Sequence, residues 1–347
     1  MKNRSIDAWL ILTSSLLIVF GLVMVYSASA MVAFERSGDE LYYLTRQLIA
    51  LGVGLVLCLT TAVTPMRVIR RYRVFLYGFV LFGLILCFIP GIRYGANGAY
   101  RWIGFGPVHW QPSEFAKIIV LIMLADYLDT FRRQIADSRV VLKAILVPLP
   151  ALVLILPQPD FGTTAIIAGL CCIMVFMAGL RLAHTAVAFC GALVIGIPAM
   201  IWEPYRVQRL TSFLDPWKTM DAEGYHVIQS WVAMHSGGFW GQGLGNSVAK
   251  LHFLPEPWTD FIGAVIAEEL GLAAIFVLVG LYTMFVWRGL HIARNARDSF
   301  SMLLASTLTI MVGLEAFFNL GVVMGILPPK GLVLPFISYG ATAMMSH

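Results

Sequence analysis

The sequence has 347 residues, of which 59% are hydrophobic and only 12% are charged, and its mean hydropathy is +0.82. This excess of apolar residues excludes a soluble domain with a single core and indicates a polytopic membrane protein. The net charge of +5 fits attraction to anionic lipid. No aromatic-basic motif points to nucleic acid as a partner.

Apolar segments near the ~20 residues that cross a bilayer predict one all-α membrane domain, residues 1–347, with about ten transmembrane helices. The expected spans are 8–30, 47–64, 74–90, 113–128, 141–157, 163–180, 183–202, 261–287, 299–327 and 332–347. No small-residue cleavage site follows the first span, so we expect a retained helix there. The last would extend about 24 Å, short of the ~30 Å hydrocarbon core, which indicates a truncated or unusually short helix.

The basic residues predict the orientation, because lysine and arginine concentrate in cytoplasmic loops. With the N-terminus in the cytoplasm, 14 of the 24 lysines and arginines fall on that side and nine on the other. The cluster from Arg67 to Arg73 is the strongest anchor. We therefore expect both ends in the cytoplasm and two outer loops, 91–112 and 203–260, the second between helices 7 and 8.

The outer loop 203–260 combines four tryptophans with several glycine clusters, which is typical of a structured cap at the membrane interface. Within it, residues 225–234 alternate in a way that predicts a short amphipathic helix. Residues 237–245 are glycine-rich like a phosphate-binding loop, but they follow no expected strand, so this signal is weak.

Three carboxylates lie at the end of this loop and just beyond it: Asp260 at the mouth of an apolar helix, and Glu268 and Glu269 inside that helix. A charge at bilayer depth costs roughly 2.5 to 3.5 kcal/mol, so these acids require chemistry, transport or pairing. The two glutamates begin about 12 Å below Asp260, and we expect them to be buried hydrogen-bonding or proton-linked groups. Asp260, with Thr259, could alternatively cap the helix.

The remaining chemistry-bearing residues exclude several classes of enzyme. The five cysteines lie in apolar segments, and the seven histidines show no spacing typical of a metal site. No P-loop, nucleophile elbow or long-period repeat occurs. We therefore expect no nucleotide and no organic cofactor.

Seven motifs occur in order between residues 97 and 340. They are NGAYRWI (97–103), QPSEFAK (111–117), QPDFG (158–162), FLDPW (213–217), GQGLGNS (241–247), LPEPWTDF (254–261) and LPFISYG (334–340). On these motifs the chain resembles the SEDS family of shape, elongation, division and sporulation proteins, and it is closer to the division members. The resemblance implies a ten-helix bundle in the bacterial inner membrane and peptidoglycan glycosyl transfer from lipid II. It also implies a class B penicillin-binding protein and other division proteins as partners at the septum.

The resemblance further implies that Asp260 is the essential carboxylate, and an outer-surface position suits a base for a sugar hydroxyl. The departing pyrophosphate needs positive charge, and the candidates on the outer side are Arg101, Arg206, Arg209, Lys250 and Lys330. Further candidates for substrate contact are Asp160, Glu256 and Ser338, and a turn role for Asp160 stays equally open. A divalent cation, Mg or Mn, could share the pyrophosphate, although the sequence shows no ligand set.

Glu114 and Lys117 allow two interpretations. They lie three residues apart on one helical face and could neutralise each other. Alternatively, Lys117 reaches Asp260, lowers the pKa of that carboxyl and keeps it ionised, with Glu114 in the same cavity. Glu315 and Asn319 form a similar polar pair that could bind across helices.

Two other functions remain open from the sequence. Buried acids and a basic surface also suit a flippase that moves lipid II between leaflets, but the matched charges gather on the outer side and not along a path. A non-catalytic division scaffold is the third possibility. Trp258 and Gly263 stand where the SEDS family commonly has histidine and phenylalanine, so we expect a different shape around Asp260.

Overall fold

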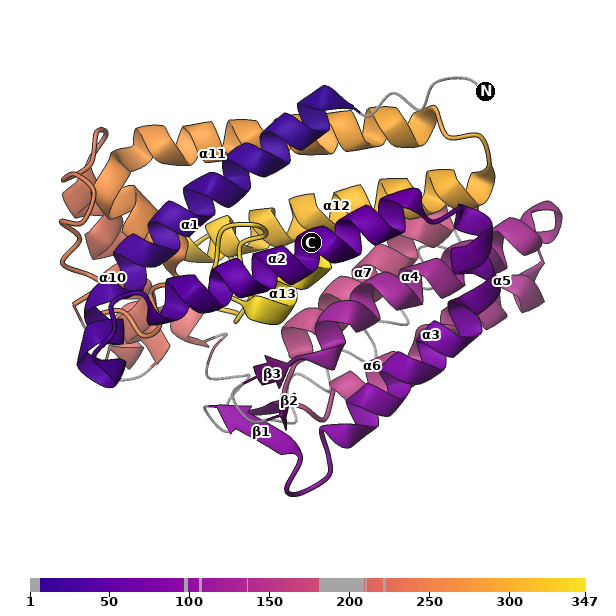
Figure 1. The fold of residues 1–347 in the computed structure, drawn as a ribbon, viewed down its shortest axis with the longest axis horizontal. Coiled ribbons are helices and arrows are strands. Elements are labelled where there is room, and N and C mark those ends of the chain that lie inside the picture. Colours follow the sequence, from indigo (N-terminus) through magenta and orange to yellow (C-terminus); the bar gives the residue numbers. More distant parts are fainter. Residues whose placement is uncertain are drawn as a thin grey trace.

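The computed structural model describes residues 7–96, 99–105, 108–135, 137–180, 209, 211–220, 223–251 and 253–347. Most of these residues form helices that run along the long axis of the molecule, with a small sheet beside them (Figure 1). The helices are α1 (Ala8–Ser37), α2 (Tyr42–Val63), α3 (Met66–Leu86), α4 (Pro112–Thr130), α5 (Ser138–Leu146), α6 (Leu149–Ile155), α7 (Phe161–Met177), α10 (Glu223–Gly237), α11 (Ile262–Arg294), α12 (Ser299–Val323) and α13 (Ala341–Ser346). Two short 3-10 helices, η1 (Arg132–Gln134) and η2 (Pro216–Thr219), complete the described helical elements.

In the described part of the chain, five helical segments are long and apolar enough to cross a membrane: α1, α2, α5 with α6, α11 and α12. Helix α7 is apolar but shorter, and α3 and α4, of 21 and 19 residues, run within the same bundle (Figure 1). The predicted polytopic helical bundle is thus confirmed. The expected span 183–202 lies outside the described residues, and the count of ten spans stays a prediction.

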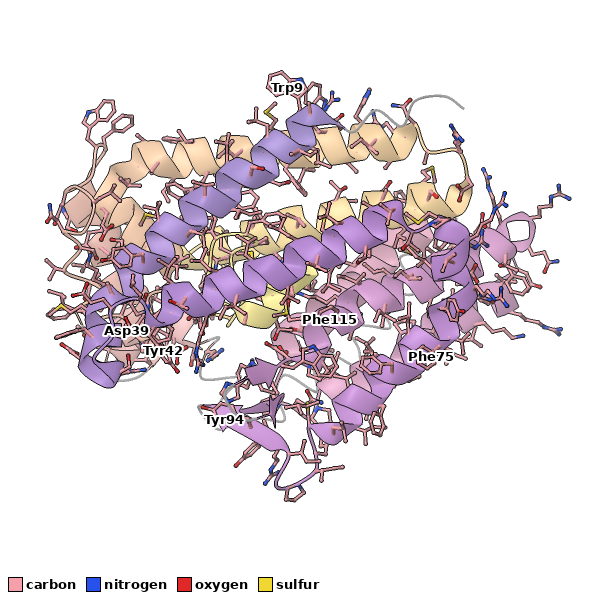
Figure 2. All side chains as sticks on the ribbon, viewed as in Figure 1. Trp9, Asp39, Tyr42, Phe75, Tyr94 and Phe115 are labelled. Carbon is pink, nitrogen blue, oxygen red and sulfur yellow. The ribbon has the colours of Figure 1, made fainter. Side chains whose placement is uncertain are left out.

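Large apolar side chains cover the outward faces of the bundle. Figure 2 shows Trp9 on α1 and Phe75 on α3 projecting from it, and they are 53% and 71% exposed. Apolar surface on this scale is rare on soluble monomers. It fits contact with hydrocarbon along helices of membrane-spanning length.

Three clusters of buried apolar residues form the core, two of them large, and α12 contributes to each. In the first, Phe300 and Leu124 are buried among α3, α4, α7 and α12. In the second, Leu17 and Met24 of α1 pack with α11 and with residues 334–337. Helix α12 therefore links the half of the bundle that carries α4 to the half that carries α11.

Ion pairs close one end of the bundle. Arg70 of α3 contacts Asp126 and Asp129 of α4 at 2.7 and 2.8 Å, and Arg73 contacts Asp126 at 2.6 Å. The two arginines belong to the expected cytoplasmic anchor. Their pairing shows that the basic cluster also fixes α3 against α4.

The outer loop 91–112 contains strands, which the all-α prediction did not include. It forms a three-stranded antiparallel sheet of β1 (Arg93–Ala96), β2 (Ala99–Phe105) and β3 (Val108–Trp110), with β2 in the centre. The sheet places Arg101 on the central strand, beside the start of α4.

The predicted helix over 332–347 is also wrong for most of its length, because only α13 is helical. Phe336 has a positive φ of 65°, and the segment before α13 crosses α1 so closely that a Cβ on Gly21 would lie 2.5 Å from the Phe336 carbonyl oxygen. The Tyr282 hydroxyl donates to the Pro335 carbonyl. Irregular backbone at membrane depth is tolerated where protein encloses it in this way.

Candidate active site

A cavity of about 890 Å³ opens between α2, the sheet, the start of α4, the residues before α11 and the segment 331–345. Its volume is within the ~300–1,000 Å³ range of ligand sites. Six of the predicted site residues line it: Asp260, Glu256, Arg101, Arg209, Glu114 and Lys117. The structure therefore brings together most of the residues that the sequence indicated.

Three successive carbonyl groups hold the backbone at Asp260. The Trp258 carbonyl accepts from the Tyr339 N–H at 2.8 Å, and the Thr259 carbonyl accepts from the Ser338 hydroxyl at 2.7 Å. The Asp260 carbonyl accepts from the Asn319 side-chain amide at 3.0 Å. Ser338 is buried and supports the backbone of the acid, and its predicted contact with substrate stays a prediction.

The Asp260 carboxyl faces the cavity and is not a helix cap, because Phe261 is the N-cap of α11. Burial, followed by the charge of Glu256, raises the pKa of Asp260 to about 7, while Arg209 and Arg101 act in the opposite direction. This contradicts the expectation of a lowered pKa. A general base works best when its pKa lies near the operating pH, so the raised value favours proton abstraction.

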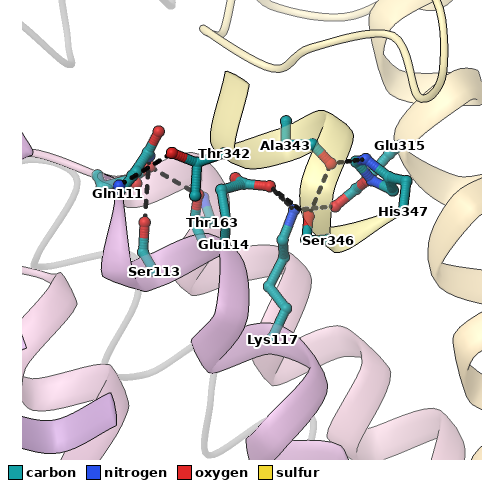
Figure 3. Close-up of polar contacts among 11 residues, drawn as sticks. Gln111, Ser113, Glu114, Lys117, Thr163, Glu315, Thr342, Ala343, Ser346 and His347 are labelled. Carbon is teal, nitrogen blue, oxygen red and sulfur yellow. Dashed lines mark hydrogen bonds and ion pairs between the residues drawn. The ribbon is translucent and has the colours of Figure 1, made fainter. Parts of the chain in front are cut away.

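Lys117 does not pair with Asp260 as one interpretation proposed. Its ammonium contacts Glu114 at 3.0 Å and Glu315 of α12 at 2.6 Å (Figure 3). The other oxygen of Glu315 contacts His347 Nε2 at 2.6 Å. Mutual neutralisation with Glu114 is therefore confirmed, and Glu315 is a second partner supplied by helix packing.

The expected binding of Glu315 and Asn319 across helices is confirmed, and the two side chains have different partners. The Asn319 side-chain amide donates to the backbone carbonyls of Asp260 and Leu332, at 3.0 and 2.6 Å. Residues at i and i+4 share a helix face, but each of these two meets a different neighbour. Glu315 belongs to the charged wall of the cavity, and Asn319 supports the backbone of the acid.

Arg101 is fixed by the turn between α6 and α7. Its Nε donates to the Gln158 carbonyl at 3.1 Å, and its Nη2 donates to the Pro159 carbonyl. Asp160 accepts from the Thr163 N–H at 3.2 Å and caps α7, and its nearer oxygen is 3.9 Å from the Arg101 guanidinium. The turn role of Asp160 is confirmed. The carbonyls of this turn hold Arg101 in the wall of the cavity.

The remaining predicted cations differ in their surroundings. The Lys330 ammonium lies 5.6 Å from the Phe161 ring and 5.2 Å from the Phe318 ring, and burial lowers its pKa. Lys250 is buried against Glu269 at 2.7 Å and is not among the residues that line the cavity, and its predicted substrate contact stays a prediction. Arg206 lies outside the described residues.

Sequence reasoning missed other cavity residues, notably Arg46 and Tyr339. The Arg46 guanidinium lies over the Tyr42 ring at 4.3 Å. Its only signal in the sequence was its place just before an expected span, which does not distinguish a membrane anchor from a site residue. His109 of β3 also lines the cavity.

Comparison with known sequences agrees with this arrangement. The profile of the cell cycle protein family of FtsW, RodA and SpoVE matches residues 7–347. A probable peptidoglycan glycosyltransferase FtsW of Coxiella burnetii is 40% identical, covering 99% of this chain and 93% of the relative. Stage V sporulation protein E of Bacillus subtilis is 36% identical, covering 99% and 94%.

Solved structures share the fold. RodA, the rod shape determining protein of Thermus thermophilus, matches with a TM-score of 0.71 at 26% identity, covering 100% of this chain and 94% of that one. A chain described under "Structural coordination of polymerization and crosslinking by a peptidoglycan synthase complex" matches with a TM-score of 0.81 at 28% identity, covering 99% and 95%. The chain therefore belongs to the FtsW, RodA and SpoVE family of cell cycle proteins, which is the SEDS family.

Proposed function

We propose that this protein is a peptidoglycan glycosyltransferase that polymerises lipid II, with Asp260 as the general base. The observation that carries the proposal is the Asp260 carboxyl, which faces a cavity of about 890 Å³ lined also by Arg101 and Arg209. The name of the Coxiella burnetii relative, a probable peptidoglycan glycosyltransferase, supports the same activity.

The reaction needs a base on one sugar and positive charge on the other. The 4-hydroxyl oxygen of the acceptor sugar attacks the anomeric carbon of the donor, and its proton passes to Asp260. A new O4–C1 bond forms as the bond from C1 to the pyrophosphate oxygen breaks, and polyprenyl pyrophosphate leaves. A positioned base contributes typically 10²- to 10⁴-fold, so orientation and charge stabilisation supply the remainder.

Arg101 and Arg209 are the residues that we assign to the pyrophosphate. Both line the cavity, and a guanidinium can bind two phosphate oxygens at once. The Gln158 carbonyl already holds Arg101 at Nε, which reduces the freedom that the side chain loses when it binds. Arg46 of α2 lines the cavity too and adds a third positive group.

A divalent cation, Mg or Mn, belongs to this proposal. When bound, it would neutralise charge on the leaving pyrophosphate. Glu256 is the carboxylate beside Asp260 that also lines the cavity and could hold the cation, and Mg commonly uses one or two carboxylates with phosphate oxygens and water. In the described ranges no group of three or more His, Cys, Asp or Glu residues could hold a metal alone, so the residues fit a cation that arrives with the substrate.

We place the cavity on the outer face of the bacterial inner membrane, at the septum, with the N-terminus in the cytoplasm. The excess of basic residues at the opposite end supports this orientation. We assign a class B penicillin-binding protein as partner. The likeness to a chain of a peptidoglycan synthase complex, described as coordinating polymerization and crosslinking, supports that assignment.

The test is polymerisation of lipid II by the purified protein and by Asp260→Asn. Asparagine keeps the size of the side chain and removes the base, so we expect the rate to fall at least ~100-fold with unchanged membrane insertion. Asp298→Asn is the matched control, because Asp298 is an exposed N-cap of α12 and asparagine caps equally well. Leaflet exchange of lipid II without polymer would support a flippase, and neither activity would support a scaffold.

A further inference from the structure

Helix α11 is broken at Gly271, where the backbone has φ 78° and ψ 179°. The break separates a short segment, 262–270, that follows Asp260 from the longer segment 272–294. A break inside an apolar helix leaves N–H and C=O groups without helical partners, and in a membrane each must be satisfied by protein.

The glycine-rich loop after α10 supplies those partners. The N–H groups of Leu272 and Ala273 donate to the Gly238 and Phe239 carbonyls at 3.0 and 3.1 Å. In return, the Gln242 and Gly243 N–H groups donate to the carbonyls of residues 268 and 269, at 3.0 and 2.8 Å. The loop is thus paired with the broken helix on both sides of the break.

The glycines in this loop are required by the close approach. A Cβ on Gly241 would lie 2.2 Å from the Glu269 carbonyl oxygen, and a Cβ on Gly271 would lie 2.3 Å from the Phe239 carbonyl oxygen. Both residues also have φ near +80°, which favours glycine. The motif GGFWGQGLG (237–245) therefore serves contact with a helix and not with phosphate.

Two buried carboxylates fasten the next part of the loop. Glu268 accepts from the Ser247 hydroxyl and from the Val248 and Ala249 N–H groups, both at 3.1 Å. Glu269 is fully buried and contacts the Lys250 ammonium at 2.7 Å. These are the two glutamates expected to be buried hydrogen-bonding groups, and that prediction is confirmed.

Lys250 uses all three of its ammonium donors inside this cluster. Besides Glu269 it donates to the Gly245 carbonyl at 2.7 Å and to the Ser27 hydroxyl of α1 at 3.4 Å. Ser27 in turn donates to both oxygens of Glu269, at 2.9 and 2.7 Å. The cluster therefore ties the loop, α11 and α1 at one point.

We propose that the Lys250–Glu269 ion pair, with Ser27, closes a ring of chain that positions Asp260. The pair joins residues 19 apart in sequence, and Asp260 lies at the middle of the segment between them. Lys250 and Glu269 are thus positioning residues for the base, and this inference rests on the proposed function. Without the pair, the segment gains freedom on both sides of Asp260, and misplacement by about 1 Å can cost 10²-fold in rate.

The experiment measures amide hydrogen exchange and steady-state kinetics in the same full-length variants. For Lys250→Met and Glu269→Gln we expect faster exchange at residues 242–249 and 256–261. We also expect a kcat reduced roughly 10- to 100-fold with KM changed less than about threefold. Because residues that act as a unit are non-additive, the double variant should be little worse than either single one.

Ser27→Ala and Thr283→Ala complete the set. Ser27→Ala leaves the ion pair and removes one donor, so it should fold normally and show a smaller change in the same direction. Thr283 is exposed on α11 and its hydroxyl donates to the Val279 carbonyl of its own helix, so Thr283→Ala should change neither measurement.

Two results would overturn the inference: unchanged exchange at 256–261 in both ion-pair variants, or faster exchange there with an unchanged kcat per folded molecule. If the Lys250→Met protein does not fold, exchange at 256–261 and kcat can still be measured in Glu269→Gln and Ser27→Ala. Absence of polymerisation by the unaltered protein would refute the proposed function instead, while the exchange measurement still tests the ring.

Discussion

The pH dependence of polymerisation is the sharpest test of Asp260 as the base. With a pKa of about 7, only about one carboxyl in a hundred is ionised at pH 5, against roughly nine-tenths at pH 8. If ionised Asp260 accepts the proton, kcat/KM should therefore fall roughly 90-fold from pH 8 to pH 5. A carboxyl with an ordinary pKa of about 3.9 would remain roughly nine-tenths ionised at pH 5 and would give a nearly flat profile.

The fall of kcat/KM at low pH is the acidic limb of the profile, and the charges around Asp260 predict how this limb shifts in variants. The negative charge of Glu256 raises the pKa of Asp260, and the positive charge of Arg209 lowers it. Glu256→Gln should therefore shift the limb to lower pH, and Arg209→Gln should shift it to higher pH. The quantity to compare is the pH at which kcat/KM falls to half its maximum. The maximum itself should also fall in Arg209→Gln, because Arg209 is assigned to bind the pyrophosphate.

The assay is polymerisation of fluorescent lipid II, with initial rates at subsaturating substrate between pH 4.5 and 9. Arg297→Gln is the control, since Arg297 is exposed in the turn between α11 and α12 and should leave the limb in place. A limb that stays in place in both cavity variants would refute the assignment, as would a profile that is flat down to pH 5.

Three further predictions address the support of the site. Gly331→Ala places a Cβ 3.2 Å from Asp260 Oδ2, so kcat should fall roughly tenfold with normal thermal unfolding, and an unchanged kcat would contradict this contact. Lys117→Met leaves Glu114 and Glu315 without their shared cation and should lower the free energy of unfolding by roughly 3–5 kcal/mol. Adding Glu114→Gln should recover only part of this loss, and full recovery would argue against Glu315 as a partner. Asp126→Asn breaks the contacts to Arg70 and Arg73 and should cost roughly 1–3 kcal/mol with unchanged kcat per folded molecule, whereas a lower kcat would place Asp126 in the catalytic machinery.

Sequence reasoning located the helices and the acid because both have local signals. Apolar length identifies a span wherever it occurs, and α1, α2, α11 and α12 follow the expected ranges. The LPEPWTDF motif singled out Asp260, and the loop composition indicated a structured cap around it. These features depend on residues close together in the chain.

Within the site, sequence reasoning missed the partners of the charged groups, which depend on how the helices pack. Lys117 was weighed between Glu114 and Asp260, and the structure adds Glu315 from α12, whose separation of 198 residues leaves no local trace. Lys250 was assigned to substrate because it was basic and on the outer side, but Glu269 lies within its reach. A charged side chain next to an apolar segment can be solvated or can pair with a buried partner, and sequence periodicity does not distinguish these two cases.

The pairing of these lysines bears directly on the chemistry of the base. A free ammonium within ~4 to 6 Å of Asp260 would lower its pKa and weaken it as a proton acceptor. Lys117 also lines the cavity, yet two carboxylates share its charge, and Lys250 is neutralised by Glu269 outside the cavity. Arg101 and Arg209 are then the positive groups that lower the pKa of Asp260. The burial of Asp260 and the negative charge of Glu256 raise this pKa by more. The cavity can therefore offer arginines to a pyrophosphate while its acid keeps a pKa near neutrality, as transfer of a hydroxyl proton requires.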